Sequence, residues 1–460
     1  MSFEPEKYFN KEEIESSDFY LPLPPKPYPI HSDLINLSGG RPNSGFYPVE
    51  SISLNLKKSP FDKNPTTESL EIPFDNEGST SELDITQGLQ YAPGQGFPQL
   101  LSQISKFTQF HGANIDEFQS LITSGSGDSL NKILQGFIDP DDTILVENYT
   151  YTPIFATFKF NKGIMIPLPI EFDPSGTNPH LNPETLEDIL KNWHKGPYKD
   201  LKFPKFLFTV PTQNPSGLLT SFEIIQKVLK IVETFDLLII EDDPDGFIRH
   251  LPEIPKNEEI ITNVKFQEYK KSLHNSSYLS TNSPRVLHLV SKTTTKAPSG
   301  LSQLVLTNLI KHWNESISSI IEDGDEREEI DGYLSWTYKV SLEYTKRSEG
   351  LFNHFQTLKS VTRKLISPIK PQGGMFFIIK FNFKLDRGQF EALRFKFIKY
   401  GVLVILGNLM SFDNEYSANS DFIRLTLSNV DKVDELIEGV DRLDKAVLEY
   451  YDLDYGTDTC

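Results

Sequence analysis

The chain has 460 residues, of which 38% are hydrophobic, and a formal net charge of −19. It can therefore bury a core, and its acidic surface argues against nucleic acid and anionic membranes as partners, because both attract basic faces. The single cysteine, Cys460, excludes an internal disulfide framework, and the acidic, mixed N-terminal segment shows no targeting signal, so we expect a cytoplasmic protein that spans no membrane.

The first 240 residues predict an N-terminal arm followed by alternating strands and helices. Residues 1–45 are rich in proline and irregular. Short apolar runs then predict strands at 121–123, 143–147, 206–210 and 237–240, with helices at 130–137 and 224–234. Strands that alternate with helices are typical of βαβ units, so we expect a mostly parallel sheet.

The second half of the chain changes character. Residues 249–285 are polar and resemble a surface insertion, and a helix is expected at 304–313. After about residue 340 the pattern is α+β, with helices expected at 346–364, at 389–400 and from 432, and strands at 373–379, 402–406 and 422–427. We therefore predict an α/β protein with a large domain built on a mostly parallel sheet and a smaller α+β C-terminal domain.

Four loops follow predicted parallel strands, where open α/β sheets bind their ligands. The loop at 123–128 contains Ser126 and Gly127, and small residues before a helix let the backbone approach an anion; an ordinary turn would have the same composition. Tyr151 could stack on a flat cofactor or simply pack. Asn214, held between prolines, can donate a hydrogen bond in one fixed direction or can belong to a rigid turn.

The fourth loop begins with Asp242, directly after the apolar run at 237–240. A carboxylate at the end of a buried strand is costly to leave unpaired. It therefore caps a helix, faces solvent or meets a buried cation, and a protonated pyridine nitrogen would be such a cation.

Taken together, the motifs resemble aminotransferases of class I and II, which have fold type I, and especially the fungal branch that acts on aromatic amino acids and 2-aminoadipate. The matching stretches run from about residue 35 to the last helix: LSGGRPN (37–43), LQYAPGQG (89–96), VPTQNPSG (210–217), IIEDDP (239–244), APSGLSQ (297–303), QGGMF (372–376) and IRL (423–425). The resemblance implies pyridoxal 5'-phosphate as cofactor and transamination between an L-amino acid, aromatic or of the 2-aminoadipate type, and a 2-oxo acid.

The resemblance also assigns roles to individual residues. It implies that Asn214 bonds the phenolic oxygen of the cofactor, that Asp242 pairs with its ring nitrogen, and that Tyr151 stacks on the ring. Ser126 and Gly127 would cradle the phosphate, and Arg424 would bind the substrate α-carboxylate.

Three further expectations concern organisation and assembly. Tyr91 matches a tyrosine that family members contribute to the phosphate site of the neighbouring subunit, which implies a homodimer. The domains implied are an arm at 1–45, a large cofactor-binding domain at 46–335 and a small domain at 336–460.

The segment that should carry the catalytic lysine departs from the family pattern. Lys292 follows the right strand and Ser291 and is the candidate for the Schiff-base lysine, although residues 291–293 could equally belong to the far side of a gap; Lys296 is a weaker match. Compared with the family pattern, we expect a deletion near 290–297 that removes a strand, a helix and a phosphate-binding arginine. Asp245 replaces a family tyrosine, and Asp128 places a negative charge beside the phosphate loop. The alternative to an active aminotransferase is therefore a catalytically impaired relative of the family or an incomplete gene product.

Overall fold

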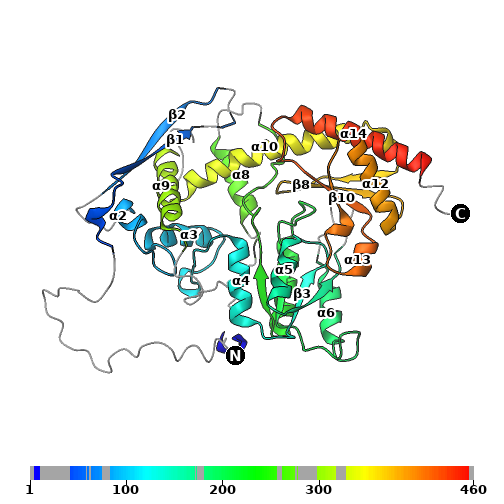
Figure 1. Cartoon of the computed structure of the whole chain (residues 1–460), viewed down its shortest axis with the longest axis horizontal. Helices are drawn as coiled ribbons and strands as arrows, with labels where there is room; N and C mark the ends of the chain where they lie inside the picture. Colours follow the sequence, from blue (N-terminus) through cyan, green and yellow to red (C-terminus); the bar gives the residue numbers. More distant parts are fainter. Residues whose placement is uncertain are drawn as a thin grey trace. The chain divides into compact units, whose positions relative to one another are not determined.

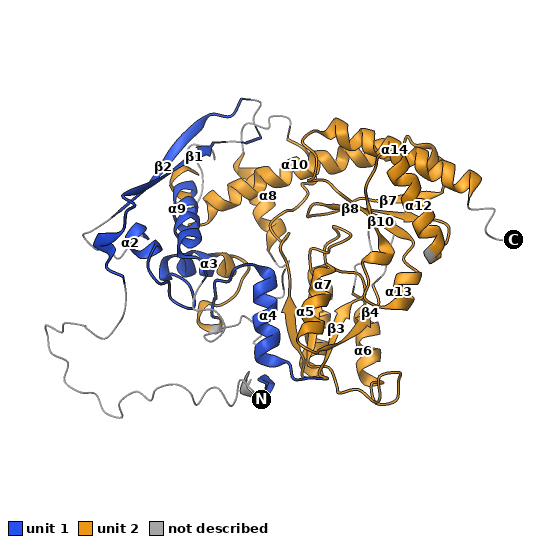
Figure 2. Cartoon of the chain, viewed as in Figure 1, with its two compact units in different colours: residues 1–106, 119–140, 288–313 blue, residues 107–118, 141–287, 314–460 orange. Residues whose placement is uncertain are grey.

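The computed structural model describes residues 5–10, 42–58, 60–61, 64–74, 83–170, 172, 181–255, 262–274, 277, 298–317 and 328–454. The chain forms two compact units (Figure 2). Unit 1 comprises residues 1–106, 119–140 and 288–313, and unit 2 comprises residues 107–118, 141–287 and 314–460. The domain limits expected from the sequence, 1–45, 46–335 and 336–460, remain a prediction.

The centre of unit 2 is a parallel sheet with the strand order β4-β3-β5-β6. Its members are β3 (Thr143–Glu147), β4 (Ile164–Leu168), β5 (Phe206–Thr209) and β6 (Leu238–Glu241). Every residue of β3 and β5 is buried, as the continuous apolar runs predict for strands covered on both faces. The mostly parallel α/β fold expected from the sequence is thereby confirmed.

Three helices of the parallel sheet carry their apolar residues at helical spacing. They are α5 (Pro153–Phe160), α6 (Pro183–Lys191) and α7 (Phe222–Thr234). In α7 the Ser221 hydroxyl caps the N-terminus by accepting from the Ile224 amide, and Ile225, Val228 and Val232 are buried. These residues form one core with Leu207 of β5, so burial of apolar surface fixes the helices to the sheet.

A second, antiparallel sheet in unit 2 has the order β7-β8-β10-β9, and α10, α12 and α14 lie around it (Figure 1). Its strands are β7 (Ile366–Ile369), β8 (Phe376–Phe381), β9 (Ile405–Leu406) and β10 (Phe422–Thr426). The helices α10 (Asp331–Phe355), α11 (Lys359–Thr362), α12 (Arg387–Lys399) and α14 (Val433–Leu453) share its core, and the short α13 (Asn414–Ala418) precedes β10. This α+β arrangement agrees with the pattern after residue 340.

The expectation of a surface insertion at 249–285 is wrong for its central part. Residues Asn263–Leu273 form α8, in which Phe266 and Tyr269 are buried. The Tyr269 hydroxyl donates to the Phe247 carbonyl at 2.6 Å, and Lys270 forms a buried ion pair with Asp331 at 2.7 Å. Polar composition concealed an apolar face at helical spacing, and this face packs inside unit 2.

Unit 1 consists of a two-stranded ribbon and helices. The ribbon pairs β1 (Ser51–Lys57) with β2 (Thr67–Pro73), and the helices are α2 (Ile85–Gly88), α4 (Ser126–Phe137) and most of α3 (Pro98–Phe110) and α9 (Gly300–Ser316). The strand expected at 121–123 is not formed. The Ile122 amide bonds the Gln95 carbonyl at 2.8 Å, and no ladder along this segment is present in the described residues.

No described helix combines the length and the apolar character needed to cross a bilayer.

Candidate active site

Three of the predicted site residues follow neighbouring parallel strands. Val146 of β3 pairs with Phe208 of β5, and Phe208 pairs with Ile240 of β6, so the three strands end at the same edge of the sheet. The loops that leave this edge carry Tyr151, Asn214 and Asp242. The register thus brings together segments that lie up to 91 positions apart in the sequence, between residues 151 and 242.

The loop at 210–217 is held rigidly by its own backbone and by the segment 371–376. The Gln213 amide bonds the Leu218 carbonyl at 3.0 Å, and the Gln372 amide bonds the Gly217 carbonyl at 2.8 Å. Gly217 has φ +68°, and a Cβ there would lie 2.6 Å from Pro371 Cβ and 2.7 Å from the Phe376 carbonyl oxygen. Glycine is therefore required at this position, and the turn fixes Asn214 in direction.

Arg424 reaches this loop from β10 of the antiparallel sheet. Its Nη1 donates to Asn214 Oδ1 at 2.8 Å, and its guanidinium carbon lies 4.2 Å from the centre of the Phe376 ring. Its buried Nε has no partner among the described residues. Burial lowers the pKa of Arg424, and the nearby Tyr151 opposes this shift. The structure therefore joins two predicted site residues, Arg424 and Asn214, and adds Phe376 as a neighbour of the arginine.

Asp242 directly follows β6, and its backbone amide bonds the Thr209 carbonyl at 3.1 Å. Burial raises the pKa of Asp242 to about 6, and the charge of Asp243 adds to the shift. Within the described residues its carboxylate has no hydrogen bond or ion pair. Such a desolvated carboxylate would gain from a cation placed beside it.

The next carboxylates of this loop have different surroundings. Asp243 Oδ1 accepts from the Thr212 amide at 3.2 Å, which ties the Asp242 loop to the Asn214 loop. Asp245 is almost fully buried, and burial together with the charges of Asp243 and Asp242 raises its pKa to about 6. The buried Arg249 opposes this shift, and its Nη1 donates to Thr212 Oγ1 at 2.8 Å.

Tyr151 remains accessible, with 45% of its surface exposed. Its loop is anchored by the residues before it: the Tyr149 hydroxyl donates to the Tyr416 carbonyl at 3.0 Å, and the Thr150 amide bonds the Met410 carbonyl at 3.3 Å. An anchored loop with an exposed aromatic ring can offer that ring to a flat ligand.

Unit 1, taken by itself, contains the predicted anion loop. Ser126 begins α4, and the preceding Gly125 has φ +141° and no side-chain cap, so the first amides of this 12-residue helix have no capping side chain. A Cβ at Gly127 would meet nothing within 4 Å. Asp128, which we expected to repel an anion, forms an ion pair with Lys132 and accepts from the Ser124 amide at 3.0 Å. The pairing offsets its charge.

The other predicted residues fall outside these clusters. Tyr91 belongs to unit 1 and is 64% exposed. Lys292 and Lys296, the candidates for the catalytic lysine, lie outside the described residues.

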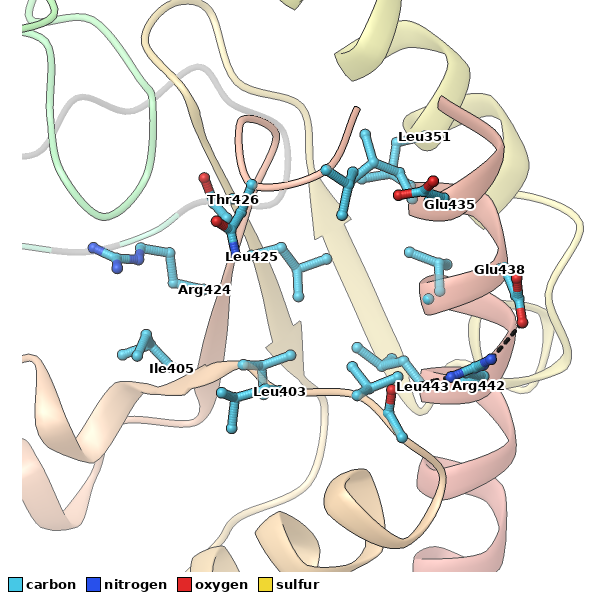
Figure 3. A pocket seen from close by; sticks show the side chains of 18 residues that line it. Leu351, Leu403, Ile405, Arg424, Leu425, Thr426, Glu435, Glu438, Arg442 and Leu443 are labelled. Carbon is cyan, nitrogen blue, oxygen red and sulfur yellow. Dashed lines mark hydrogen bonds and ion pairs between the residues drawn. The ribbon is translucent and has the colours of Figure 1, made fainter. Parts of the chain in front are cut away.

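A pocket of about 560 Å³ lies beside β10 but has a different character (Figure 3). Aliphatic side chains from the segment 401–405 and from α14 line it, among them Leu403 and Leu443. Arg424 borders the pocket, but its guanidinium points away from these side chains, as Figure 3 shows. Asn214 and Asp242 do not line the pocket, and Arg424 is the member of the polar cluster that borders it.

Comparisons with known proteins agree with this architecture. The family model "Aminotransferase class I and II" matches residues 52–243. Aromatic amino acid aminotransferase 2 of Saccharomyces cerevisiae is 30% identical over 477 residues, covering 92% of this chain and 92% of the yeast protein. The mitochondrial kynurenine/alpha-aminoadipate aminotransferase of Mus musculus is 26% identical over 419 residues, covering 86% of this chain and 87% of the mouse protein.

Comparison with solved structures also indicates an aminotransferase. The crystal structure of the aromatic aminotransferase Aro9 from Candida albicans superposes with a TM-score of 0.85 at 28% identity, covering 98% of this chain and 99% of that chain. The protein is therefore a member of the class I and II aminotransferases, enzymes of fold type I that use pyridoxal phosphate.

Proposed function

We propose that this aminotransferase transfers an amino group from an aromatic or 2-aminoadipate-type L-amino acid to a 2-oxo acid. The observation that carries the proposal is the 2.8 Å bond between Arg424 Nη1 and Asn214 Oδ1. It brings a cation suited to an α-carboxylate beside the loop suited to the cofactor, at the edge of the sheet where Asp242 directly follows β6. The relatives named for aromatic amino acids and aminoadipate support the substrate class.

The described residues at the sheet edge fit pyridoxal phosphate. Asp242 is desolvated and lacks a bonded partner there, and the protonated nitrogen of the cofactor ring would supply one. Asn214 accepts from Arg424 through Oδ1, which leaves Nδ2 to donate to the phenolic oxygen. Tyr151 would cover a face of the ring. When bound, the cofactor supplies an electron-withdrawing ring that stabilises negative charge at the substrate α-carbon.

The cofactor phosphate would bind at the start of α4. The uncapped amides at Ser126 and Gly127 supply donors, and the positive end of the helix favours an anion. The open space around Gly127 leaves room for a close approach.

The protein's own groups then divide the work of the reaction. Arg424 would hold the substrate carboxylate with two parallel N–H bonds, and the Phe376 ring limits the orientations of its guanidinium. Lys292 Nζ would remove the proton from the substrate α-carbon as a general base and donate it again later in the same reaction as a general acid. Asp242 would keep the ring nitrogen protonated throughout.

The alternative, a catalytically impaired relative or an incomplete gene product, is not favoured by the comparisons, because the match extends over 92% of both this chain and the yeast enzyme.

The direct test is turnover by the purified protein supplied with pyridoxal phosphate. L-Phenylalanine, L-tyrosine and L-2-aminoadipate are offered as donors with 2-oxoglutarate as acceptor, and glutamate is measured. We expect glutamate to form with at least one of these donors and not with their D-enantiomers. Cofactor binding without glutamate from any donor would reject the proposed substrate class.

Assembly and location complete the proposal. We propose a homodimer in which the exposed Tyr91 of one subunit contributes to the phosphate site of the other. Sedimentation at equilibrium tests the dimer, and a monomer that retains full turnover would contradict it. A cytoplasmic location is proposed as well, and imaging of a fluorescent fusion tests it.

A further inference from the structure

A fully buried carboxyl group lies behind the sheet edge and has no part in the chemistry assigned above. Glu147 is the last residue of β3 and is 0% exposed. Its Oε1 accepts from Thr209 Oγ1 at 2.6 Å and from the Val210 amide at 3.3 Å. Both donors belong to the end of β5 and the start of the loop that carries Asn214. The side chain therefore ties the ends of β3 and β5 together.

The same place contains a buried amide that joins two site loops. Gln213 Nε2 donates to the Tyr149 carbonyl at 2.9 Å, and its Oε1 accepts from the Ser216 amide at 3.1 Å and from Ser216 Oγ at 2.8 Å. One side chain thus holds the loop of Tyr151 on one side and the loop of Asn214 on the other. Glu147 bonds the residues that lead into this second loop.

Because these groups are buried, the hydrogen bonds of Glu147 are difficult to replace, and the positions of the two loops depend on them. Burial raises the pKa of Glu147 to about 7, while bonding from Thr209, Val210 and Gln213 opposes the shift. Glu147 Oε2, Asn148 Nδ2 and Thr150 Oγ1 are buried and have no partner in the described part of the chain. With so few alternatives for hydrogen bonding, loss of the Oε1 acceptor would leave Thr209 and Val210 unsatisfied as well.

We propose that Glu147 is a positioning residue that fixes the Tyr151 and Asn214 loops relative to each other through Thr209, Val210 and Gln213. The inference rests on the proposed roles of Tyr151 and Asn214 at the cofactor ring. What the site requires at position 147 is an oxygen acceptor at Oε1. Glu147→Gln keeps that acceptor, whereas Glu147→Leu removes it at similar size.

The chain offers a matched control in the same unit. Asp444 of α14 is also buried, and its Oδ1 accepts from the Ser360 amide at 2.8 Å and from Ser360 Oγ at 2.5 Å. It makes the same kind of bonds as Glu147, but to the segment before β7. Asp444→Leu therefore measures the general cost of losing a buried carboxyl acceptor.

The test is amide hydrogen exchange of the cofactor-free protein, followed in peptides that cover 148–152 and 211–218. Glu147→Leu should speed exchange in both loops about tenfold, as expected for the loss of one or two buried hydrogen bonds, while Glu147→Gln stays near wild type. Asp444→Leu should leave both loops unchanged. If Glu147→Leu does not fold, Thr209→Val removes the hydroxyl donor at the other end of the bond and should speed exchange in the same loops.

Unchanged exchange in the two loops, an equal increase throughout the protein, or an effect of Glu147→Gln as large as that of Glu147→Leu would overturn the proposal. The dissociation constant of pyridoxal phosphate, measured by calorimetry, is the second readout and should rise about tenfold in Glu147→Leu only. If wild type binds no cofactor while the loops respond as expected, the roles proposed for Tyr151 and Asn214 fail and the positioning role of Glu147 stands.

Discussion

At the scale of single residues, the site contains two charged side chains with atoms that lack a hydrogen-bond or ion-pair partner in the described residues. Asp242 is a carboxylate without a bonded partner in the described residues, and Arg424 has a buried Nε without one. Both groups gain from a ligand of opposite charge, because desolvation strengthens the attraction between charges. We therefore propose that Asp242 pairs with the ring nitrogen of the cofactor and that Arg424 binds the substrate carboxylate. One substitution tests each assignment.

Asp242→Asn keeps the shape of the side chain but removes its charge. We expect kcat to fall by about 10²-fold or more, since an uncharged amide no longer favours the protonated ring nitrogen. In wild type, the affinity of the cofactor-free protein for pyridoxal phosphate should weaken as the pH falls through about 6, where the unpaired Asp242 carboxyl takes up a proton. Steady-state rates at pH 8 check the variant, and cofactor titrations between pH 5 and 8 check the pH dependence. An unchanged kcat in the variant would remove Asp242 from the ring nitrogen.

Arg424→Lys keeps the positive charge but removes the planar pair of donors. We expect KM for the amino acid to rise by about 10-fold or more, with a smaller change in the affinity for pyridoxal phosphate. Phe376→Leu serves as the companion variant, because it removes the ring 4.2 Å from the guanidinium and should raise KM by a smaller factor. Equal KM values in wild type and Arg424→Lys would contradict the carboxylate assignment.

The sequence was most informative for site residues that lie shortly after a predicted strand. Asn214, Asp242 and Tyr151 were predicted because apolar runs ended just before them. Phe376 and Glu147 were missed, since an aromatic after Gly-Gly-Met and an acid at a strand end have no pattern of their own. Their roles depend on contacts with Arg424 and Thr209, which lie 48 and 62 positions away in the chain.

At the scale of elements, the apolar runs of β3, β5 and β6 and the spacing in α7 were sufficient to predict a parallel sheet with its covering helices. Two elements were predicted wrongly. The segment 121–123 has the composition of a strand but no partner strand in the described residues, and α8 is polar overall with a narrow buried face. Pairing and packing are decided by distant parts of the chain, which local composition does not report.

Gly217→Ala tests the turn that presents Asn214. The Cβ would lie 2.6 to 2.8 Å from Pro371, Phe376 and Gly373 at a positive φ, so we expect the free energy of unfolding to fall by about 3 kcal/mol and cofactor affinity to weaken. Gly439→Ala in α14 is the control, because a Cβ there meets nothing within 4 Å, and it should stabilise by about 0.5–1 kcal/mol. Denaturant unfolding of the cofactor-free proteins measures both. Similar effects of the two variants would argue against a strained turn.

At the scale of the whole molecule, the parallel and the antiparallel sheet belong to one compact unit, unit 2, and the division into a large and a small domain remains a prediction. Composition marks the change from α/β to α+β architecture, but compactness depends on which segments pack together. The order of segments in the chain does not give that information.

Buried acids make the stability of the whole protein depend on pH. The raised pKa of Glu147, about 7, lies above its unfolded value of about 4.3, so the folded protein binds this proton more tightly and loses stability as the pH rises between the two values. Burial lowers the pKa of His111 to about 4, which gives the opposite slope. We therefore compare wild type with Glu147→Gln.

Between pH 5 and pH 8, the free energy of unfolding of wild type should fall relative to that of Glu147→Gln by up to about 3 kcal/mol. Urea unfolding of the cofactor-free proteins at both pH values gives the difference. A constant difference would show that Glu147 does not change its protonation state over this range.

The central claim, that this chain is a working pyridoxal phosphate enzyme, is tested most directly at its lysine. The purified protein is mixed with pyridoxal phosphate, reduced with borohydride and digested, and the labelled peptide is identified by mass spectrometry. We predict a visible absorbance band before reduction and a single label on Lys292. The absence of both the band and the label would contradict the claim and would mean that the chain retains the aminotransferase fold without its reaction.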